Sequence, residues 1–405
     1  MLENRKNRKT REAKPNIIKQ QNNDELVKSV AVGFLRIVEK IDDPRTRHCD
    51  YPLSEILLTA VTAVLCGSES CQDIATFGRA QSDWLKQFVP LKNGIPSHDT
   101  FRRVFLLLKP EAFREAYGEM FQGLTIDKKG SHIAIDGKTS RGCYNEKGKS
   151  LLNMVSAWDT ENGISLGQVA TKNEEGKDVG EFNAIPKLVN QLDVNDALVT
   201  IDAGGCYVEI VDAIIDGGGN YAVTLKENQP TLHTITETIF EQHRQNDFAS
   251  LASYRETSRG HGREEERTYY AVPASSDDAR LAKWPSLSSL VMGMFRRTMS
   301  GGKTTEHIRY YISSLSSDCV ERLGQSLRCH WGIENGLHWI LDVSFGEDSN
   351  RTRRGHGAEN LSILRRIALG MLNQVKGKKT IPNVKFQAAV DPEFRTTILK
   401  KFLMR

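Results

Sequence analysis

Three kinds of sequence feature are missing from this chain of 405 residues. No apolar run is long enough to cross a bilayer, and the charged N-terminus lacks the apolar segment of a secretory signal. The seven cysteines are odd in number and form no Cys-x-x-Cys pair, which argues against a disulfide framework and against a zinc knuckle. These absences predict a cytoplasmic protein with reduced thiols.

Several common catalytic signatures are also missing. The histidines at positions 330 and 338 do not stand in the His-Glu-x-x-His order of zinc proteases. The glycine groups at 204–205 and 217–219 form neither a P-loop nor a dinucleotide fingerprint, and no Gly-x-Ser-x-Gly elbow occurs. With no convincing nucleophile or nucleotide motif, the acidic residues become the candidates for chemistry.

Positive charge is concentrated in a few places although the net charge is only +4. Residues 1–20 hold seven lysines and arginines against two glutamates. The stretch Arg351–Arg354 is basic as well, and the chain ends in a third basic cluster at residues 400–405. Local clusters on a nearly neutral chain are typical of a polyanion site. For residues 1–20, a solvated tail explains the charge equally well.

The spacing of apolar residues changes along the chain and predicts an α/β protein. Residues 25–128 show helical periodicity, whereas short apolar runs separated by turns follow from residue 129 onward, alternating with helices. This order is typical of a mixed α/β sheet. The predicted segments are a basic disordered tail (1–24), an all-helical N-terminal domain that binds DNA (25–128), the first part of the sheet domain (129–250), a β-rich insertion (251–315), the last part of the sheet domain with a long helix (316–380), and a basic C-terminal segment (381–405).

Two aspartates follow predicted buried strands. Asp136 comes after Ile133-Ala-Ile, and Asp202 comes after Leu198-Val-Thr-Ile. Side chains just past the ends of such strands converge at one edge of an α/β sheet. Two carboxylates placed together repel each other unless a cation lies between them, and Mg²⁺ prefers oxygen ligands. A metal site is therefore one interpretation, and the alternative is that each aspartate only caps a turn or the next helix.

A third acid, Glu334, lies in a helical run. The i, i+3, i+4 rule puts it on a face that should point inward. That face also carries Leu327, Trp331, His338 and Leu341. A glutamate on an inward face needs a partner, which could be a metal, an ion pair with Arg328 or a hydrogen bond to His338. Three other acids compete for the same role: Asp342, Glu347 and Asp348.

Motifs spread over most of residues 30–375 carry a family resemblance. They are Asp43-Pro-Arg, Tyr51-Pro-Leu-Ser-Glu-Ile-Leu, Ile95-Pro-Ser-His-Asp-Thr-Phe-Arg-Arg, Ala134-Ile-Asp-Gly-Lys-Thr, Asp202-Ala, Leu225-Lys-Glu-Asn-Gln, His261-Gly-Arg-Glu, the run from His330-Trp-Gly-Ile-Glu-Asn-Gly-Leu-His-Trp to Phe345-Gly-Glu-Asp, and Asn360-Leu-Ser-Ile-Leu-Arg-Arg. With these motifs the chain resembles the H-repeat-associated group of bacterial insertion-sequence transposases, within the DDE class.

The resemblance implies an RNase H-like catalytic core interrupted by a β-rich insertion. By motif position, Asp136, Asp202 and Glu334 are the three catalytic acids and the metal ligands. They would hold two ions of Mg²⁺ or Mn²⁺ roughly 3.5–4 Å apart. The implied reaction is cleavage of DNA at the ends of a mobile element and strand transfer into target DNA. The sequence departs from related transposases at His330, where arginine is usual, and at Leu341, where lysine is usual.

Double-stranded DNA, comprising the terminal inverted repeats and the target, is the implied partner. We expect a homodimer on DNA, because two element ends must be joined, and association with the bacterial nucleoid when DNA is bound. The predicted DNA-binding residues are Lys138, Arg141, Lys226, Asn228, Gln229, Arg263, His330 and His338. Exposure in a turn is the alternative explanation, and the favoured one, for Lys138, Arg141, Lys226, Asn228 and Gln229. The competing functions are a metal-dependent nuclease without strand transfer and a catalytically silent DNA-binding relic.

Overall fold

The computed structural model describes residues 28–46, 49–122, 130–144, 152–172, 179–260 and 262–403. The predicted basic tail, residues 1–24, and His261 lie outside this described part. The chain divides into two compact units: Thr125–Ile340 forms one, and Met1–Leu124 together with Leu341–Arg405 forms the other. Among the described residues, every helix is too short or too polar to span a membrane.

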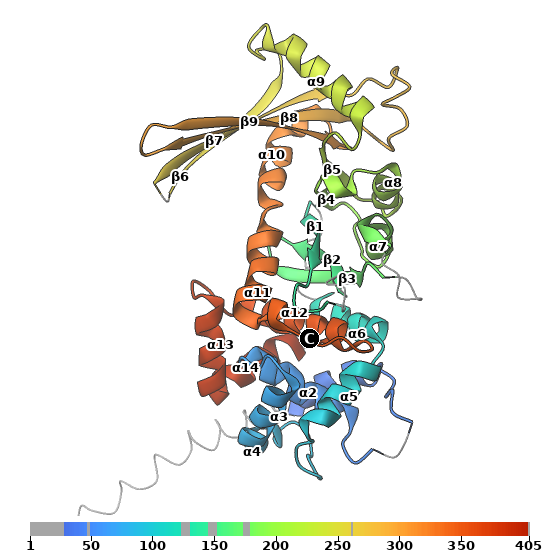
Figure 1. The fold of residues 1–405 in the computed structure, drawn as a ribbon, viewed down its shortest axis with the longest axis vertical. Helices are drawn as coiled ribbons and strands as arrows, with labels where there is room; N and C mark the ends of the chain where they lie inside the picture. The colour runs from blue at the N-terminus through green and yellow to red at the C-terminus, as the bar shows by residue number, and fades with distance from the viewer. Residues whose placement is uncertain are drawn as a thin grey trace, which may run out of the picture. The chain divides into compact units, whose positions relative to one another are not determined.

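The unit Thr125–Ile340 is built on one mixed sheet of nine strands, in the order β3-β2-β1-β4-β5-β9-β8-β7-β6 (Figure 1). Its central strands β1, β4 and β5 are parallel, and the other neighbours pair antiparallel. The strands are β1 (His132–Thr139), β2 (Asn153–Asp159), β3 (Ile164–Ala170), β4 (Leu198–Ile201), β5 (Asn220–Leu225), β6 (Ala252–Gly260), β7 (Arg263–Pro273), β8 (Ser289–Met299) and β9 (Thr304–Ser313). The mixed α/β sheet is thus confirmed. Because β9 pairs with β5, the β-rich strands extend the central sheet rather than forming a separate one.

Helices cover both faces of the central strands. On one face lie α7 (Gly180–Val189) and α8 (Val208–Asp216), and on the other lies α10 (Val320–Cys329) (Figure 1). Alternation along β4 explains this arrangement, since Val199 and Ile201 pack in the cluster with α7 and α8 while Leu198 packs in the cluster with α10. A further helix, α9 (Pro230–Arg244), follows β5.

Strand β6 has no counterpart among the strands predicted from the sequence. Its sequence, Ala-Ser-Tyr-Arg-Glu-Thr-Ser-Arg-Gly, contains almost no apolar residue, and most of it is exposed. The strand forms because its backbone pairs with β7 along its whole length, from Ala252 with Ala271 to Gly260 with Arg263. Pairing of this kind depends on the partner strand and leaves no apolar pattern to detect.

All the regular secondary structure described in the other unit is helical. Its long helix α12 (Gly357–Asn373) is buried over most of its length and packs against α2 and α5. Its helices are α2 (Leu53–Leu65), α3 (Cys71–Ala80), α4 (Ser82–Leu85), α5 (His98–Leu107), α6 (Pro110–Gln122), α12, α13 (Ile381–Val390) and α14 (Pro392–Leu403). The predicted all-helical character of the N-terminal part is confirmed within residues 28–122, apart from the gap at 47–48.

The segment predicted only as basic, residues 381–405, folds into α13 and α14 up to residue 403. Ile398 and Phe402 of α14 are buried, and so is the cation Arg395. Arg395 donates to the carbonyls of Ala388 and Ala389, and its guanidinium carbon lies 4.2 Å from the centre of a Trp84 ring. This segment therefore contributes to the core of its unit in addition to carrying charge.

Candidate active site

The parallel pairing of β1 with β4 brings two aspartates to the same edge of the sheet. The last paired residues are Ile135 and Ile201, and the next residue on each strand is an acid, Asp136 or Asp202. Asp202 follows the end of β4, as predicted. Asp136 lies inside β1 rather than beyond it, because β1 continues past β4 and pairs there with β2. The Asp136 side chain is only 16% exposed, whereas Asp202 is exposed.

The third acid, Glu334, begins a π-helical turn, Glu334–His338, which lies between α10 and α11 (Trp339–Phe345). The amide of Trp339 donates to the carbonyl of Glu334, which is the five-residue spacing of a π-helix. This turn corrects the predicted inward face, since Trp331 is 48% exposed and the Glu334 side chain is 51% exposed. The prediction assumed uninterrupted α-helical spacing, but α10 ends at Cys329 and the wider π turn changes the angle between successive side chains.

His338, at the end of the π turn, connects two of the acids. Its Nδ1 lies 3.5 Å from Oδ2 of Asp136 and 3.6 Å from Oε2 of Glu334. These three side chains each offer a ligand atom within 4.8 Å of the others, the spacing of a metal-binding group. His338 is buried, and its Nε2 has no hydrogen-bond partner among the described residues. The histidine therefore faces the acids at the site rather than solvent.

The pKa values of the two acids that face His338 shift in opposite directions. Burial, together with the charges of Asp202 and Glu334, raises the pKa of Asp136 to about 8. The nearby His338 has the largest effect in lowering the pKa of Glu334, and Asp136 and Lys138 act in the same direction. In the absence of a cation, Asp136 therefore keeps a proton near neutral pH while Glu334 is ionised. A site that forces a proton onto one of its carboxyls has an excess of negative charge.

A fourth carboxylate, Glu181, lies beside the aspartates and was missed in the sequence. It belongs to the first turn of α7 and contributes to the raised pKa of Asp136. Gly137 makes room for it, because a Cβ built there would lie 1.8 Å from its Oε1, whereas one built at Gly204 would lie 3.5 Å from its Oε2, an ordinary contact. The glycine directly after Asp136 was the only sequence signal.

A chain of polar side chains runs under the site. Nδ1 of His330 lies 2.9 Å from Oγ1 of Thr200, which lies 2.7 Å from Nε2 of His132. Nδ1 of His132 in turn lies 2.9 Å from Oγ1 of Thr160. Burial lowers the pKa of His330 and lowers that of His132 to about 3, so both rings are neutral. The chain anchors the end of α10 to β1 and β4, and it puts His330 in a position to hold the Glu334 turn in place.

Comparison with known proteins identifies the family. The family described as Transposase DDE domain matches residues 127–371, and the one described as DDE_Tnp_1-associated matches residues 35–120. The chain belongs to the DDE transposase family. The confirmed mixed sheet with its helical N-terminal region is in keeping with the RNase H-like fold that the sequence resemblance implies.

Two relatives of this DDE transposase match most of its length, and a third matches a short part of it. Putative transposase YncI of Escherichia coli O157:H7 is 37% identical over 357 residues, which are 86% of this chain and 89% of the relative. H repeat-associated putative transposase YhhI of Escherichia coli K12 is 34% identical over 365 residues, 88% of this chain and 95% of the relative. Inactive transposase YbfQ of the same strain matches only 54 residues, at 48% identity, 13% of this chain and 64% of the relative. The resemblance to the H-repeat-associated group is thus confirmed.

In this DDE transposase, two predicted phosphate-contacting amides hold the loop after Asp202. Nδ2 of Asn228 donates to the carbonyl of Ala203 at 2.9 Å, and Nε2 of Gln229 donates to the carbonyl of Cys206 at 2.8 Å. Lys226 is exposed and lines a cavity of about 650 Å³ beside this loop. The two amides therefore have a positioning role, and contact with phosphate by any of the three residues stays a prediction.

The remaining predicted DNA-binding residues lie in three different places. Lys138 follows Asp136 by two positions on β1, and its charge reaches Glu334. Arg141 is exposed just after β1. Arg263 begins β7, where its Nε lies 2.8 Å from Oε1 of Glu265. The fold thus brings Lys138 to the acids and leaves Arg263 on the β6–β9 part of the sheet.

Membership of the DDE family implies a divalent cation, and the residues of this site fit one. Their donors are carboxylate oxygens, the ligands that Mg²⁺ and Mn²⁺ prefer. Burial and the charges of Asp202 and Glu334 raise the pKa of Asp136, and a cation beside the carboxylates would offset that shift. One carboxylate oxygen of Asp202, Oδ1, already accepts from the amide of Gly204, so the capping role predicted as the alternative is also real.

Proposed function

We propose that this protein is an active DDE transposase that cleaves DNA at the ends of its element and joins the freed 3′ ends to target DNA. The proposal is supported above all by one observation: Asp136, Glu334 and His338 offer ligand atoms within 4.8 Å of one another, next to Asp202. The raised pKa of Asp136 adds to that support. An excess of negative charge of this kind is the environment in which a divalent cation binds.

Asp136, Asp202 and Glu334 would hold Mg²⁺ or Mn²⁺. When bound, two such cations activate the attacking hydroxyl and stabilise the leaving oxygen of an in-line displacement. His338 holds the carboxylates of Asp136 and Glu334 in a common orientation through its Nδ1. Lys138 provides a positive charge near Glu334 that can hold a phosphate oxygen of the substrate.

The reaction needs no covalent bond between protein and DNA. In the first step a water oxygen attacks the scissile phosphorus, the bond to the 3′ oxygen breaks, and a 3′-hydroxyl and a 5′-phosphate are left. In the second step the 3′-hydroxyl attacks a phosphodiester of the target, so one bond forms as another breaks. Both steps use the same carboxylates, because each is an in-line displacement at phosphorus.

The test uses a plasmid that carries the inverted repeats flanking this gene, with Mg²⁺ or Mn²⁺. The wild type should nick and cut at the repeats. Asp136→Asn should bind the same DNA but cut it roughly 10²–10⁴-fold more slowly, as expected for the loss of several kcal/mol of transition-state stabilisation. Asp216→Asn is the matched control, because Asp216 is an exposed aspartate at the end of α8.

A second assay separates a transposase from a nuclease on the same core. Pre-cut ends with a free 3′-hydroxyl are incubated with a supercoiled target plasmid, and joined products are counted. Cutting without joining would identify the nuclease, whereas binding of the correct ends with no cutting would identify a silent relic. Because both ends must be joined in one event, we also propose that two copies assemble on DNA, which light scattering of the protein with paired ends measures.

A further inference from the structure

The β6–β9 part of the sheet has two faces that differ in charge. On one face three arginines meet three glutamates across the strands: Arg255 with Glu266, Arg259 with Glu264 and Arg296 with Glu306, at 2.6, 3.1 and 2.8 Å. The residues directly between these on each strand point to the other face. The first face is therefore electrically balanced, and any excess charge lies on the second.

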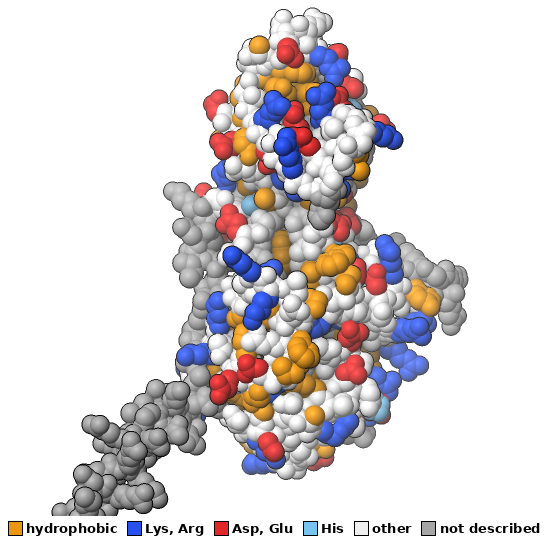
Figure 2. All heavy atoms as spheres, turned by 90° about the vertical axis from the view of Figure 1, so that its left-hand side faces the viewer, with side chains coloured by type: hydrophobic (Ala, Val, Ile, Leu, Met, Phe, Trp, Pro, Cys, Tyr) orange, Lys and Arg blue, Asp and Glu red, His pale blue; other side chains and the backbone are white. Residues whose placement is uncertain are grey.

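The second face carries an excess of arginine. The strand register puts four arginines and two glutamates there: Arg263, Arg267, Arg297, Arg309, Glu256 and Glu265. Four arginines against two glutamates leave two positive charges, and Arg328 of α10 adds a third at this face. In the space-filling view the upper part of the molecule shows blue and red side chains intermixed around exposed apolar ones (Figure 2).

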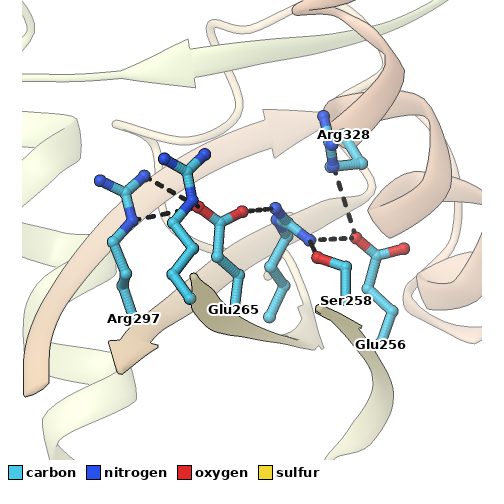
Figure 3. Close-up of polar contacts among 7 residues, drawn as sticks. Glu256, Ser258, Glu265, Arg297 and Arg328 are labelled. Atoms are coloured by element: carbon cyan, nitrogen blue, oxygen red, sulfur yellow. Dashed lines mark hydrogen bonds and ion pairs between the residues drawn. The ribbon is translucent and has the colours of Figure 1, made fainter. Parts of the chain in front are cut away.

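The two glutamates hold most of these arginines in fixed positions. Glu265 accepts from Arg263, Arg267 and Arg297, and Glu256 accepts from Arg267 and lies 3.7 Å from Arg328 (Figure 3). Burial by itself would raise the pKa of Glu265, but the three arginines outweigh it and lower that pKa. The network is therefore fully charged at neutral pH, and its guanidinium groups are preorganised.

Arg309 differs from its neighbours because no carboxylate among the described residues forms an ion pair with it. Its guanidinium carbon lies 5.4 Å from the centre of the Phe295 ring and 5.5 Å from the centre of a Trp331 ring. Rings at these distances orient a guanidinium without neutralising it. Arg309 is thus a cation that two aromatic rings keep in place and that no carboxylate among the described residues neutralises.

These residues surround a cavity of about 360 Å³ close to the proposed active site. Arg263, Arg297 and Arg309 line it from the strands, and Trp331 lines it from the helical side. Helix α10 reaches this face because Gly324 lets it approach Tyr254 and Tyr269; a Cβ there would meet both rings at 2.7 Å. Trp331 precedes Glu334 by three residues, a rise of roughly 5 Å along a helix.

We infer that this cavity, which we name the Arg309 cavity, binds the phosphate backbone of DNA that leads to the active site. The inference rests on the proposed function, because it gives the DNA of that reaction a second contact. An excess of preorganised arginines is the chemistry that recognises a phosphodiester, since guanidinium groups match the geometry of two phosphate oxygens. The balanced opposite face lacks this excess and should contribute little.

The test measures binding of a fluorescein-labelled 30-base-pair duplex by anisotropy, in EDTA so that no cleavage occurs. Arg309→Ala should weaken binding about three- to tenfold at 100 mM salt and lower the salt slope by about 1, as for the loss of one phosphate contact. Arg309→Lys should recover most of the slope because it keeps the charge. Arg280→Ala is the control, since Arg280 is an exposed arginine of the same unit, paired with Asp278 outside the cavity.

Three outcomes are decisive. If Arg309→Ala changes affinity and slope no more than Arg280→Ala does, the Arg309 cavity is not a DNA contact. If Arg309→Lys shows the same reduced salt slope as Arg309→Ala, the positive charge at this position does not contact phosphate, and the inference also fails. If the wild type binds no DNA under any salt condition, the proposed function itself fails, and that result is separate from the first two. Unchanged thermal melting of each variant confirms that it folds.

Discussion

Gly137 and Glu181 share one small space, because a Cβ at Gly137 would lie 1.8 Å from the carboxylate of Glu181. We therefore expect Gly137→Ala to push Glu181 away from Asp136 while the fold survives, since a flexible carboxylate can move. The cleavage rate should fall roughly 10–100-fold, as when groups that support metal ligands are lost. The cleavage rate of Glu181→Ala should fall by a similar factor. The double variant should be no slower than either single one, and a multiplicative loss would show that the two residues act independently.

Replacing Asp136 should stabilise the protein when no divalent cation is present. Burial and like charges raise the pKa of Asp136 to about 8 from an ordinary value of 3.8. Below pH 4 the Asp136 carboxyl is protonated in both the folded and the unfolded chain, so it does not lower the free energy of unfolding. Above pH 4 the unfolded chain releases this proton while the folded one keeps it, so stability falls until the pH passes about 8.

Asp136→Asn removes this penalty. Its Tm in EDTA should exceed that of the wild type, and the gap should widen between pH 5 and pH 7.5, with about 2–4 °C for each kcal/mol regained. Asp216→Asn, on the exposed end of α8, should show no such widening. Mg²⁺ should raise the Tm of the wild type more than that of Asp136→Asn, because only a protein that binds the cation is stabilised by it. Equal shifts in both would contradict a metal site at Asp136.

His338 should act by orienting carboxylates. His338→Ala removes the Nδ1 that faces Asp136 and Glu334. We therefore expect half-maximal single-turnover cleavage to need a roughly 10–100-fold higher Mg²⁺ concentration. His338→Asn should recover part of the loss, since its amide nitrogen can donate from a similar position. His243→Ala, near the end of α9, is the control. If His338→Asn and His338→Ala are equally slow at every Mg²⁺ concentration, orientation through Nδ1 is not the role of His338.

Replacing Asn228 tests whether this residue positions the loop after Asp202 or contacts DNA. Its amide donates to the carbonyl of Ala203, so Asn228→Ala should loosen the loop that follows Asp202, at a cost of about 1 kcal/mol for the lost hydrogen bond. We expect a several-fold higher Mg²⁺ concentration for half-maximal cleavage and an unchanged Kd for duplex DNA in EDTA. A weaker Kd with an unchanged Mg²⁺ requirement would instead support the predicted contact with phosphate. Lys226→Ala, at an exposed position two residues earlier, provides the comparison.

Some features of the site follow from short stretches of sequence. The apolar runs Ile133–Ile135 and Leu198–Ile201 predict buried strands, and each is followed by an acid. Both strands need only local information, because an apolar run between turns is itself the signal. The helical character of residues 53–122 was predictable for the same reason, from its periodicity.

The sequence pattern predicted the wrong orientation for part of the helical run that carries Glu334. Uninterrupted α-helical spacing put Trp331 on the inward face with Glu334, whereas the π turn leaves both half-exposed and buries Leu337 and His338. A π turn depends on what surrounds the helix, and its residues have no distinctive composition. The exposure of Trp331 is what lets it line the Arg309 cavity.

By itself, the sequence determined the mixed α/β class, the helical N-terminal part and the order in which Asp136, Asp202 and Glu334 occur, because these depend on neighbouring residues and on motifs. Only the tertiary structure decided that β9 joins β5 in one sheet, that Glu181 fills the space left by Gly137, and that three strands, β7, β8 and β9, bring four arginines to one face. Each of these contacts joins residues at least forty positions apart, or depends on strand register. Side-chain spacing within a single segment carries no information about either.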